Sequence, residues 1–214
     1  MNIKLVVFDM DGTLLNTMDV IVKCNNTVLK KKGYEERKYE EFFDFVGEGT
    51  RNCVSRALPK GVGDKEISDV LSKVIKEYNR EDITSIKPYD GIDKLLEELA
   101  FRDVKTAILT NKEHRYALAC ANTLFAKYRF ETVLGDSPQT PLKPDPTGLF
   151  DIIKRSCVSK KETLFVGDMK TDVLTGKNAG VKTVGCLWGF GKKELKTVGP
   201  DFLIEHPLEI LNLI

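Results

Sequence analysis

Hydrophobic residues along the chain follow different patterns in three successive stretches. Residues 3–8 form a short apolar run rich in β-branched side chains, which is typical of a strand buried on both faces of a parallel sheet. Over residues 16–85 the apolar positions recur every three to four residues, most regularly within 64–82. From residue 88 onward, short apolar runs alternate with helical patterns. The chain therefore begins with a strand, continues with several helices, and from residue 88 alternates between strands and helices.

The pattern assigns an element to most of the chain. Helices are expected over 17–32, 39–45, 50–58, 64–82, 91–102, 113–127, 147–157 and 171–178, with a last one from residue 208. Strands are expected over 104–109, 132–134, 163–166, 181–187 and 202–204. Strands that alternate with helices indicate right-handed crossovers and a parallel sheet.

These elements predict an α/β protein, a Rossmann-like doubly wound parallel sheet with a small all-helical cap domain inserted after the first strand. The Rossmann-like catalytic core is expected over 1–15 and 86–214, and the helical cap domain over 16–85. The insert interrupts the first crossover, which places it above the carboxyl ends of the strands. It would act as a lid, with hinges at 12–16 and 83–90.

Composition and charge limit the possible partners. The 214 residues include 33 basic and 32 acidic side chains, so the net charge of +1 disfavours binding to nucleic acid or a membrane surface. No signal peptide or membrane-spanning run is recognisable, and the five cysteines are widely spaced without a metal-binding motif. We expect a cytoplasmic protein with reduced core thiols and a small-molecule partner. A monomer and a homodimer are both compatible with the sequence.

Two carboxylates follow the first strand directly. Asp9 and Asp11 are two residues apart, so in extended chain both side chains point to the same place, above the carboxyl end of the strand. Such a pair favours one ionised and one protonated carboxyl group, or a bound cation. An ionised Asp9 could act as a nucleophile and a protonated Asp11 as an acid. Gly12 lets the backbone approach a bulky anion, and Thr13 supplies a hydroxyl group. Asp-Gly is also a common turn dipeptide at the end of a strand.

Later strand ends supply further polar groups. Thr110 and Asn111 follow one strand and could bind phosphate oxygens, although Asn111 could simply cap a helix. Lys143 stands in a stiff loop beside two prolines, where a solvated lysine is also common. Asp168 and Asp172 lie one turn apart if a helix begins there, and their carboxylate oxygens are suitable ligands for Mg²⁺. Alternatively, the two acids could simply stabilise the first turn of the helix.

Together these segments resemble the haloacid dehalogenase superfamily of aspartate-nucleophile phosphatases. The resemblance covers nearly the whole chain, and its motifs occur in the order typical of the family. They are DxDGT at 9–13, the hydroxyl residue Thr110, Lys143 before its proline, and GDxxxD at 167–172, whose two acids are Asp168 and Asp172. Within the family, the helical insert and the segments 46–49, 56–58 and 188–191 look most like phosphoglycolate phosphatases.

The resemblance implies roles for these residues. Asp9 would attack phosphorus to form an aspartyl-phosphate, and Asp11 would protonate the leaving alcohol and then activate water. Thr110 and Lys143 would complete the catalytic set, while Asp9, the backbone carbonyl of Asp11 and Asp168 would hold Mg²⁺. Asp172 would position Lys143 or a metal-bound water. Gly12, Thr13, Asn111, Gly49 and Arg51 are the expected substrate-binding residues, the last two from the cap.

The expected function is that of a Mg²⁺-dependent phosphatase that hydrolyses a small phosphorylated metabolite, similar to phosphoglycolate phosphatase. Two other activities of the same superfamily stay open at this point. One is a phosphomutase like β-phosphoglucomutase, and the other is a pyrophosphatase or nucleotidase. The sequence motifs do not distinguish these substrates.

Overall fold

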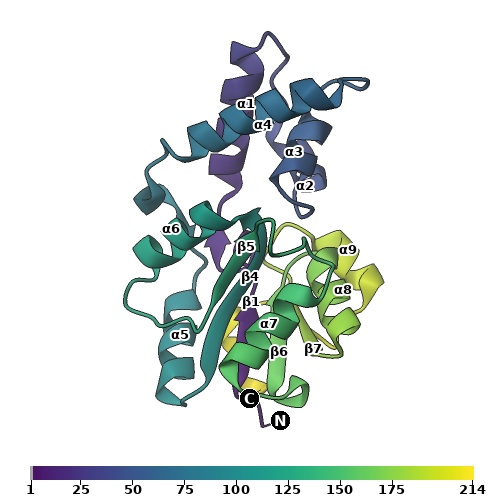
Figure 1. Cartoon of the computed structure of the whole chain (residues 1–214). Coiled ribbons are helices and arrows are strands. Elements are labelled where there is room, and N and C mark those ends of the chain that lie inside the picture. Colours follow the sequence, from purple (N-terminus) through teal and green to yellow (C-terminus); the bar gives the residue numbers. More distant parts are fainter. Residues whose placement is uncertain (1) are drawn as a thin grey trace.

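A parallel sheet forms the lower part of the computed structural model, which describes residues 2–214 (Figure 1). Its six strands lie in the order β5-β4-β1-β6-β7-β8, and every neighbouring pair is parallel. The strands are β1 Leu5–Phe8, β4 Lys105–Glu113, β5 Val133–Asp136, β6 Thr163–Gly167, β7 Lys182–Cys186 and β8 Phe202–Ile204. The expected doubly wound α/β sheet is confirmed.

Helices cover both faces of this sheet, because its central strand is apolar on both sides. Val6 and Phe8 of β1 belong to the cluster that includes residues of α5 and α6, whereas Leu5 and Val7 pack in a second cluster with α7. The helices of this part are α5 Ile92–Phe101, α6 His114–Leu124, α7 Thr147–Ser156, α8 Lys170–Ala179 and α9 Lys192–Val198. Short 3₁₀ turns lie at Lys160–Glu162 and Pro207–Asn212. Burial on both faces explains why the strand lacks a two-residue hydrophobic period.

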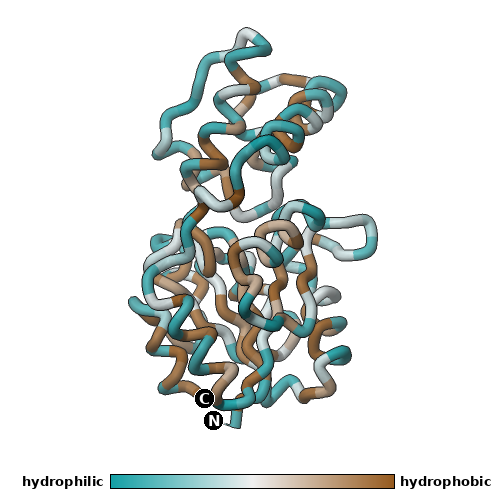
Figure 2. The backbone as a smooth tube through the Cα atoms, turned by 90° about the vertical axis from the view of Figure 1, so that its left-hand side faces the viewer, coloured by the Kyte–Doolittle hydropathy of each residue, from teal (hydrophilic) through white to brown (hydrophobic). Residues whose placement is uncertain are grey.

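A helical insert stands above the carboxyl ends of the strands (Figure 1). It contains α1 Met18–Lys31, a 3₁₀ turn at Tyr39–Glu41, α2 Phe42–Phe45, α3 Thr50–Ala57 and α4 Asp64–Tyr78, followed by a turn at Ile83–Ser85. Two short strands, β2 Leu15–Asn16 and β3 Lys87–Pro88, pair antiparallel where the chain enters and leaves this cap. The outer loops of the cap are mainly hydrophilic, and the strands below are largely hydrophobic (Figure 2). The exact limits of the cap domain remain a prediction.

Several element limits differ from the expected ones. Strand β4 continues to Glu113, four residues beyond the predicted end, because its pairing with β5 resumes at Glu113 after an irregular stretch. Thr110 and Asn111 therefore lie within the strand and not in a loop before the helix. Glu113 caps α6 instead, since its carboxylate accepts a hydrogen bond from the backbone N–H of Tyr116. Helix α9 was not expected, and the last predicted helix is a 3₁₀ turn.

The cysteine and membrane expectations can be compared with the structure. All five cysteines are free thiols; four are buried, and Cys157 is exposed at the end of α7, so the expectation of core thiols is wrong for that residue. Among residues 2–214, no helix combines the length and apolar character that a membrane crossing requires.

Candidate active site

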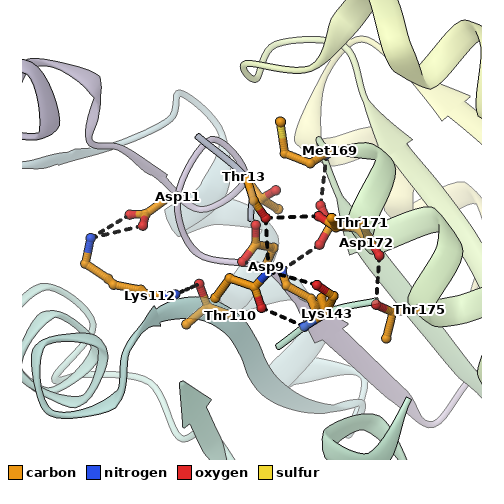
Figure 3. A network of polar contacts seen from close by, with 12 residues as sticks. Asp9, Asp11, Thr13, Thr110, Lys112, Lys143, Met169, Thr171, Asp172 and Thr175 are labelled. Atoms are coloured by element: carbon orange, nitrogen blue, oxygen red, sulfur yellow. Dashed lines mark hydrogen bonds and ion pairs between the residues drawn. The ribbon is translucent and has the colours of Figure 1, made fainter. Parts of the chain in front are cut away.

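Polar side chains from three distant segments meet at the carboxyl end of the sheet (Figure 3). Asp9 follows β1, Lys143 precedes α7, and Asp168 and Asp172 lie at the junction of β6 and α8. All four residues are at least 95% buried. The parallel sheet explains this convergence, because all its strands end at the same edge.

The ammonium group of Lys143 joins two of these carboxylates. Its Nζ lies 2.8 Å from Oδ1 of Asp9 and 2.6 Å from Oδ1 of Asp172. The other oxygen of Asp172 accepts a hydrogen bond of 2.9 Å from the backbone N–H of Met169, which fixes this carboxylate at the start of α8. Asp172 thus orients the lysine toward Asp9.

Asn111 fixes the backbone that carries Lys143. Its Oδ1 accepts a hydrogen bond of 2.7 Å from the backbone N–H of Lys143, and its Nδ2 donates to the carbonyl oxygen of the same residue at 3.1 Å. The amide group therefore satisfies both main-chain groups of the lysine. Thr110, its neighbour in β4, is buried beside the site and lines the cavity described below.

Asp168 is fully buried against the loop that follows β1. Its Oδ1 accepts a hydrogen bond of 2.8 Å from the hydroxyl of Thr13, and its Oδ2 accepts one of 2.7 Å from the backbone N–H of Phe190. Gly12 has a φ of +82°, and a Cβ atom there would lie 2.3 Å from Oδ2 of Asp168. Only glycine permits this close approach.

The three clustered acids create an excess of negative charge. Burial raises the pKa of Asp9 to about 6, and burial also raises the pKa of Asp168 well above its usual range, with further contributions from neighbouring carboxylates. Ligand oxygens of Asp9, Asp168 and Asp172 all lie within 4.8 Å of one another. Oδ1 of Asp9 is buried without a properly aligned hydrogen bond, despite its ion pair with Lys143. One ammonium cannot neutralise three carboxylates, so the cluster could hold a metal cation.

A second ion pair lies on the cap side of this cluster, and its lysine was not among the residues predicted for the site. Nζ of Lys112 is 2.9 and 3.0 Å from the two carboxylate oxygens of Asp11. Figure 3 shows these two side chains turned toward each other, apart from the group around Asp9. Lys112 reaches this place because β4 extends beyond its expected end. The sequence signal that could have identified Lys112 was its position between Thr110, a predicted site residue, and the start of α6.

A small cavity of about 70 Å³ lies between the sheet and the cap. Its lining contains Asp9, Asp11, Gly49, Thr110, Asn111 and Lys112 among the residues already named. The apolar wall comes from the cap and includes Ile21, Val46, Cys53, Ile75 and Tyr78.

Three of the expected substrate-binding residues lie elsewhere. Thr13 is completely buried on Asp168, and Gly12 faces the same carboxylate. Arg51 pairs with Asp64 at 2.9 Å and donates to the hydroxyl of Ser68, because its position on α3 turns it toward the start of α4. These three residues are outside the cavity lining, and their expected roles in substrate binding remain predictions.

The family model described as haloacid dehalogenase-like hydrolase matches residues 6–186, which include Asp9, Asp11, Thr110, Lys143, Asp168 and Asp172. The chain belongs to this family. It is 31% identical over 193 residues to a phosphoglycolate phosphatase of Pseudomonas fluorescens, with 87% of this chain and 70% of that protein covered. It is 27% identical to an N-acetylmuramic acid 6-phosphate phosphatase of Pseudomonas aeruginosa, over 100% of this chain and 96% of the relative.

A solved structure from Lactobacillus delbrueckii has the same fold as this haloacid dehalogenase-like hydrolase. The TM-score is 0.92 at 24% identity, and the comparison covers 100% of this chain and 99% of the other. This chain is therefore a hydrolase of the phosphatase type within its family. The phosphatase relatives differ in the substrate that their names give, so family membership alone does not identify the alcohol that is released.

The cap of this hydrolase is held against the core by direct contacts. The carbonyl oxygen of Gly47 accepts hydrogen bonds from Nδ2 of Asn111 at 3.0 Å and from the hydroxyl of Thr171 at 3.3 Å. The ring of Phe43 on α2 packs edge-on against Phe190 of the core, with centroids 6.0 Å apart. The structure therefore represents a closed arrangement in which the cap covers the carboxylates.

Proposed function

We propose that this hydrolase releases phosphate from a small phosphate monoester, with phosphoglycolate as the leading substrate candidate. The observation that carries the proposal is the buried ion pair between Asp9 and Lys143, whose ammonium also contacts Asp172, beside a small cavity between the sheet and the cap. An attacking carboxylate needs a fixed orientation and little competing water, and this arrangement supports both.

In the proposed reaction, an oxygen of Asp9 forms a bond to phosphorus as the bond to the alcohol oxygen breaks. Asp11, which must carry a proton before this step, gives that proton to the alcohol oxygen, so the alcohol leaves neutral and Asp9 carries an acyl phosphate. Asp11 then takes a proton from water, whose oxygen attacks phosphorus and displaces the carboxylate of Asp9. Inorganic phosphate leaves and both aspartates return to their starting state.

Charge is the main obstacle to this reaction. A phosphate dianion about 4 Å from a carboxylate is repelled by roughly 8 kcal/mol at an effective dielectric constant of 20. Lys143 offsets part of this repulsion, and the hydroxyl of Thr110 can hold a phosphate oxygen. We propose that Asp9, the carbonyl of Asp11 and Asp168 hold Mg²⁺. When bound, the ion supplies positive charge that neutralises the carboxylates and the phosphoryl oxygens.

The size of the cavity favours a small alcohol. A two-carbon alcohol with its phosphate fits this space more readily than a hexose does while the cap is closed. This size supports phosphoglycolate as the substrate candidate.

The decisive experiment measures phosphate release from a panel of metabolites with Mg²⁺ and with a chelator. The panel contains phosphoglycolate, pyrophosphate, nucleoside monophosphates, N-acetylmuramic acid 6-phosphate and hexose phosphates. Asp9→Asn should lower the rate by more than about a thousandfold, because the amide cannot form the acyl phosphate. Asp93→Asn, an exposed acid on α5, is the control. Undiminished release by Asp9→Asn would refute the mechanism, and isomerisation of a hexose phosphate without release would indicate a mutase.

A further inference from the structure

Lys112 is the only lysine or arginine that lines the cavity among the described residues. Its side chain is 7% exposed, so its ammonium is almost fully removed from bulk water. Nζ lies 4.9 Å from the ring centroid of Tyr116 and 5.7 Å from that of Tyr78. The two rings and Asp11 surround the ammonium beside the place where the alcohol must lie.

A buried ammonium is costly unless an anion accompanies it. In this structure the anion is Asp11, which uses both carboxylate oxygens on Lys112. The proposed reaction requires Asp11 to turn one oxygen toward the leaving alcohol. Lys112 would then retain one of its two contacts with Asp11, while its ammonium group has three N–H donors to satisfy. A second anion beside Asp11 would accept the remaining hydrogen bonds of Lys112.

Among the residues that the structure describes, the cap contributes no competing cation to the lining of this cavity. Its contribution to the lining is mainly apolar, as Ile21, Val46 and Ile75 illustrate. Arg51 is engaged with Asp64, and Arg56 is paired with Glu48 outside the cavity lining. A charged substituent on the alcohol would therefore meet one positive group, Lys112, between the apolar residues of the cap and the polar and acidic residues of the core that also line the cavity.

We propose that Lys112 binds a second anionic group of the substrate, a carboxylate or another phosphate attached close to the scissile bond, and thereby selects such substrates over neutral ones. The inference rests on the proposed function, whose phosphatase site it extends. In the proposed reaction the leaving oxygen would lie one hydrogen bond, about 2.8 Å, from Asp11. An oxygen of Asp11 lies 2.9 Å from Nζ of Lys112. An anion one or two carbon atoms from the leaving oxygen lies within this reach.

The first test needs only the unaltered protein and two substrates of equal size. Phosphoglycolate carries a carboxylate, whereas its amide, phosphoglycolamide, is neutral at the same position. Because a hydrogen bond to a charged group is stronger than one to a neutral group, we expect kcat/KM to favour the carboxylate by about 10- to 100-fold. Pyrophosphate and ethyl phosphate form a second pair that reveals whether the bound anion is a phosphate.

The second test asks whether Lys112 causes the preference. Lys112→Met should bring the ratio of kcat/KM between charged and neutral substrates close to one, mainly through a higher KM for the charged one. Lys112→Arg should retain part of the preference, because it keeps the charge. Lys127→Met is the matched control, since Lys127 also pairs with carboxylates and lies 4.9 Å from the Tyr128 ring, but at an exposed site.

The outcomes separate this inference from the proposed function. Equal kcat/KM for both members of each pair in the unaltered protein would overturn the role of Lys112 while leaving the phosphatase intact. A preference that survives in Lys112→Met would overturn it as well. If Lys112 only holds Asp11, the variant lowers kcat on all substrates and leaves the ratios unchanged. Failure of the phosphatase itself would appear as no release from any substrate, or as full activity of Asp9→Asn.

Discussion

Replacing Lys143 with methionine tests the electrostatic balance on which the site depends. The substitution keeps the length and most of the packing of the side chain and removes the ammonium that contacts both Asp9 and Asp172. Both carboxylates are almost completely buried, so water cannot take the place of the lysine without a rearrangement. The folded protein without metal would then hold an uncompensated cluster of acids.

The size of the effect follows from this burial. Removing one partner of a buried ion pair costs about 3–5 kcal/mol of unfolding free energy. For a protein of this size each kcal/mol shifts the melting temperature by about 2–4 °C, so a decrease of roughly 10 °C is expected. The loss should be large at pH 8 and smaller at pH 5, where protonation removes the charge of Asp9.

The sign of this pH dependence follows from the raised pKa of Asp9. The folded-state pKa is about 6, above the ordinary value of 3.8. A raised carboxyl pKa contributes stability that is complete below the unfolded pKa and is lost as the pH rises through the folded pKa. Lys143 lowers the pKa of Asp9, so the variant raises it further and extends the loss to higher pH.

Thermal unfolding at pH 5 and pH 8, with chelator and with Mg²⁺, measures this prediction. Mg²⁺ should recover part of the lost stability at pH 8, because a bound cation restores positive charge to the cluster. Lys127→Met serves as the control, since its ammonium is exposed and should change the melting temperature little. An equal loss of stability at both pH values would refute the electrostatic explanation and indicate a packing defect.

Three further predictions follow from the same contacts. Gly12→Ala should weaken Mg²⁺ binding at least tenfold in calorimetry, because its Cβ would displace Asp168, and unchanged affinity would contradict this. Asn111→Ala should speed hydrogen exchange over residues 46–50 relative to α5, because the hydrogen bond to Gly47 that holds the cap is lost; equal rates would contradict the contact. In the unaltered protein, Mg²⁺ should raise the melting temperature more at pH 8 than at pH 5, because protons compete for Asp9, and a larger rise at pH 5 would contradict its raised pKa.

Much of the fold could be predicted because each element leaves a local signal. The apolar run of β1 and the regular stripe of α4 lie close to their predicted positions. The end of β4 was misplaced because Thr110 to Lys112 are polar, and polarity at a strand end usually indicates a loop. Their burial results from neighbouring segments that lie far away in the sequence.

The candidate site, like the fold, was predictable from the sequence in part. The sequence by itself determined which chemical groups stand at the strand ends, because the order of strands and helices in a parallel sheet brings those ends to one edge. Only the tertiary structure decided which groups face one another: Asp172 contacts Lys143, Thr13 contacts Asp168, and Lys112 contacts Asp11. Such pairings depend on side-chain directions and on the position of the cap. These are set by packing between residues separated by 29 to 155 positions, which no local pattern encodes.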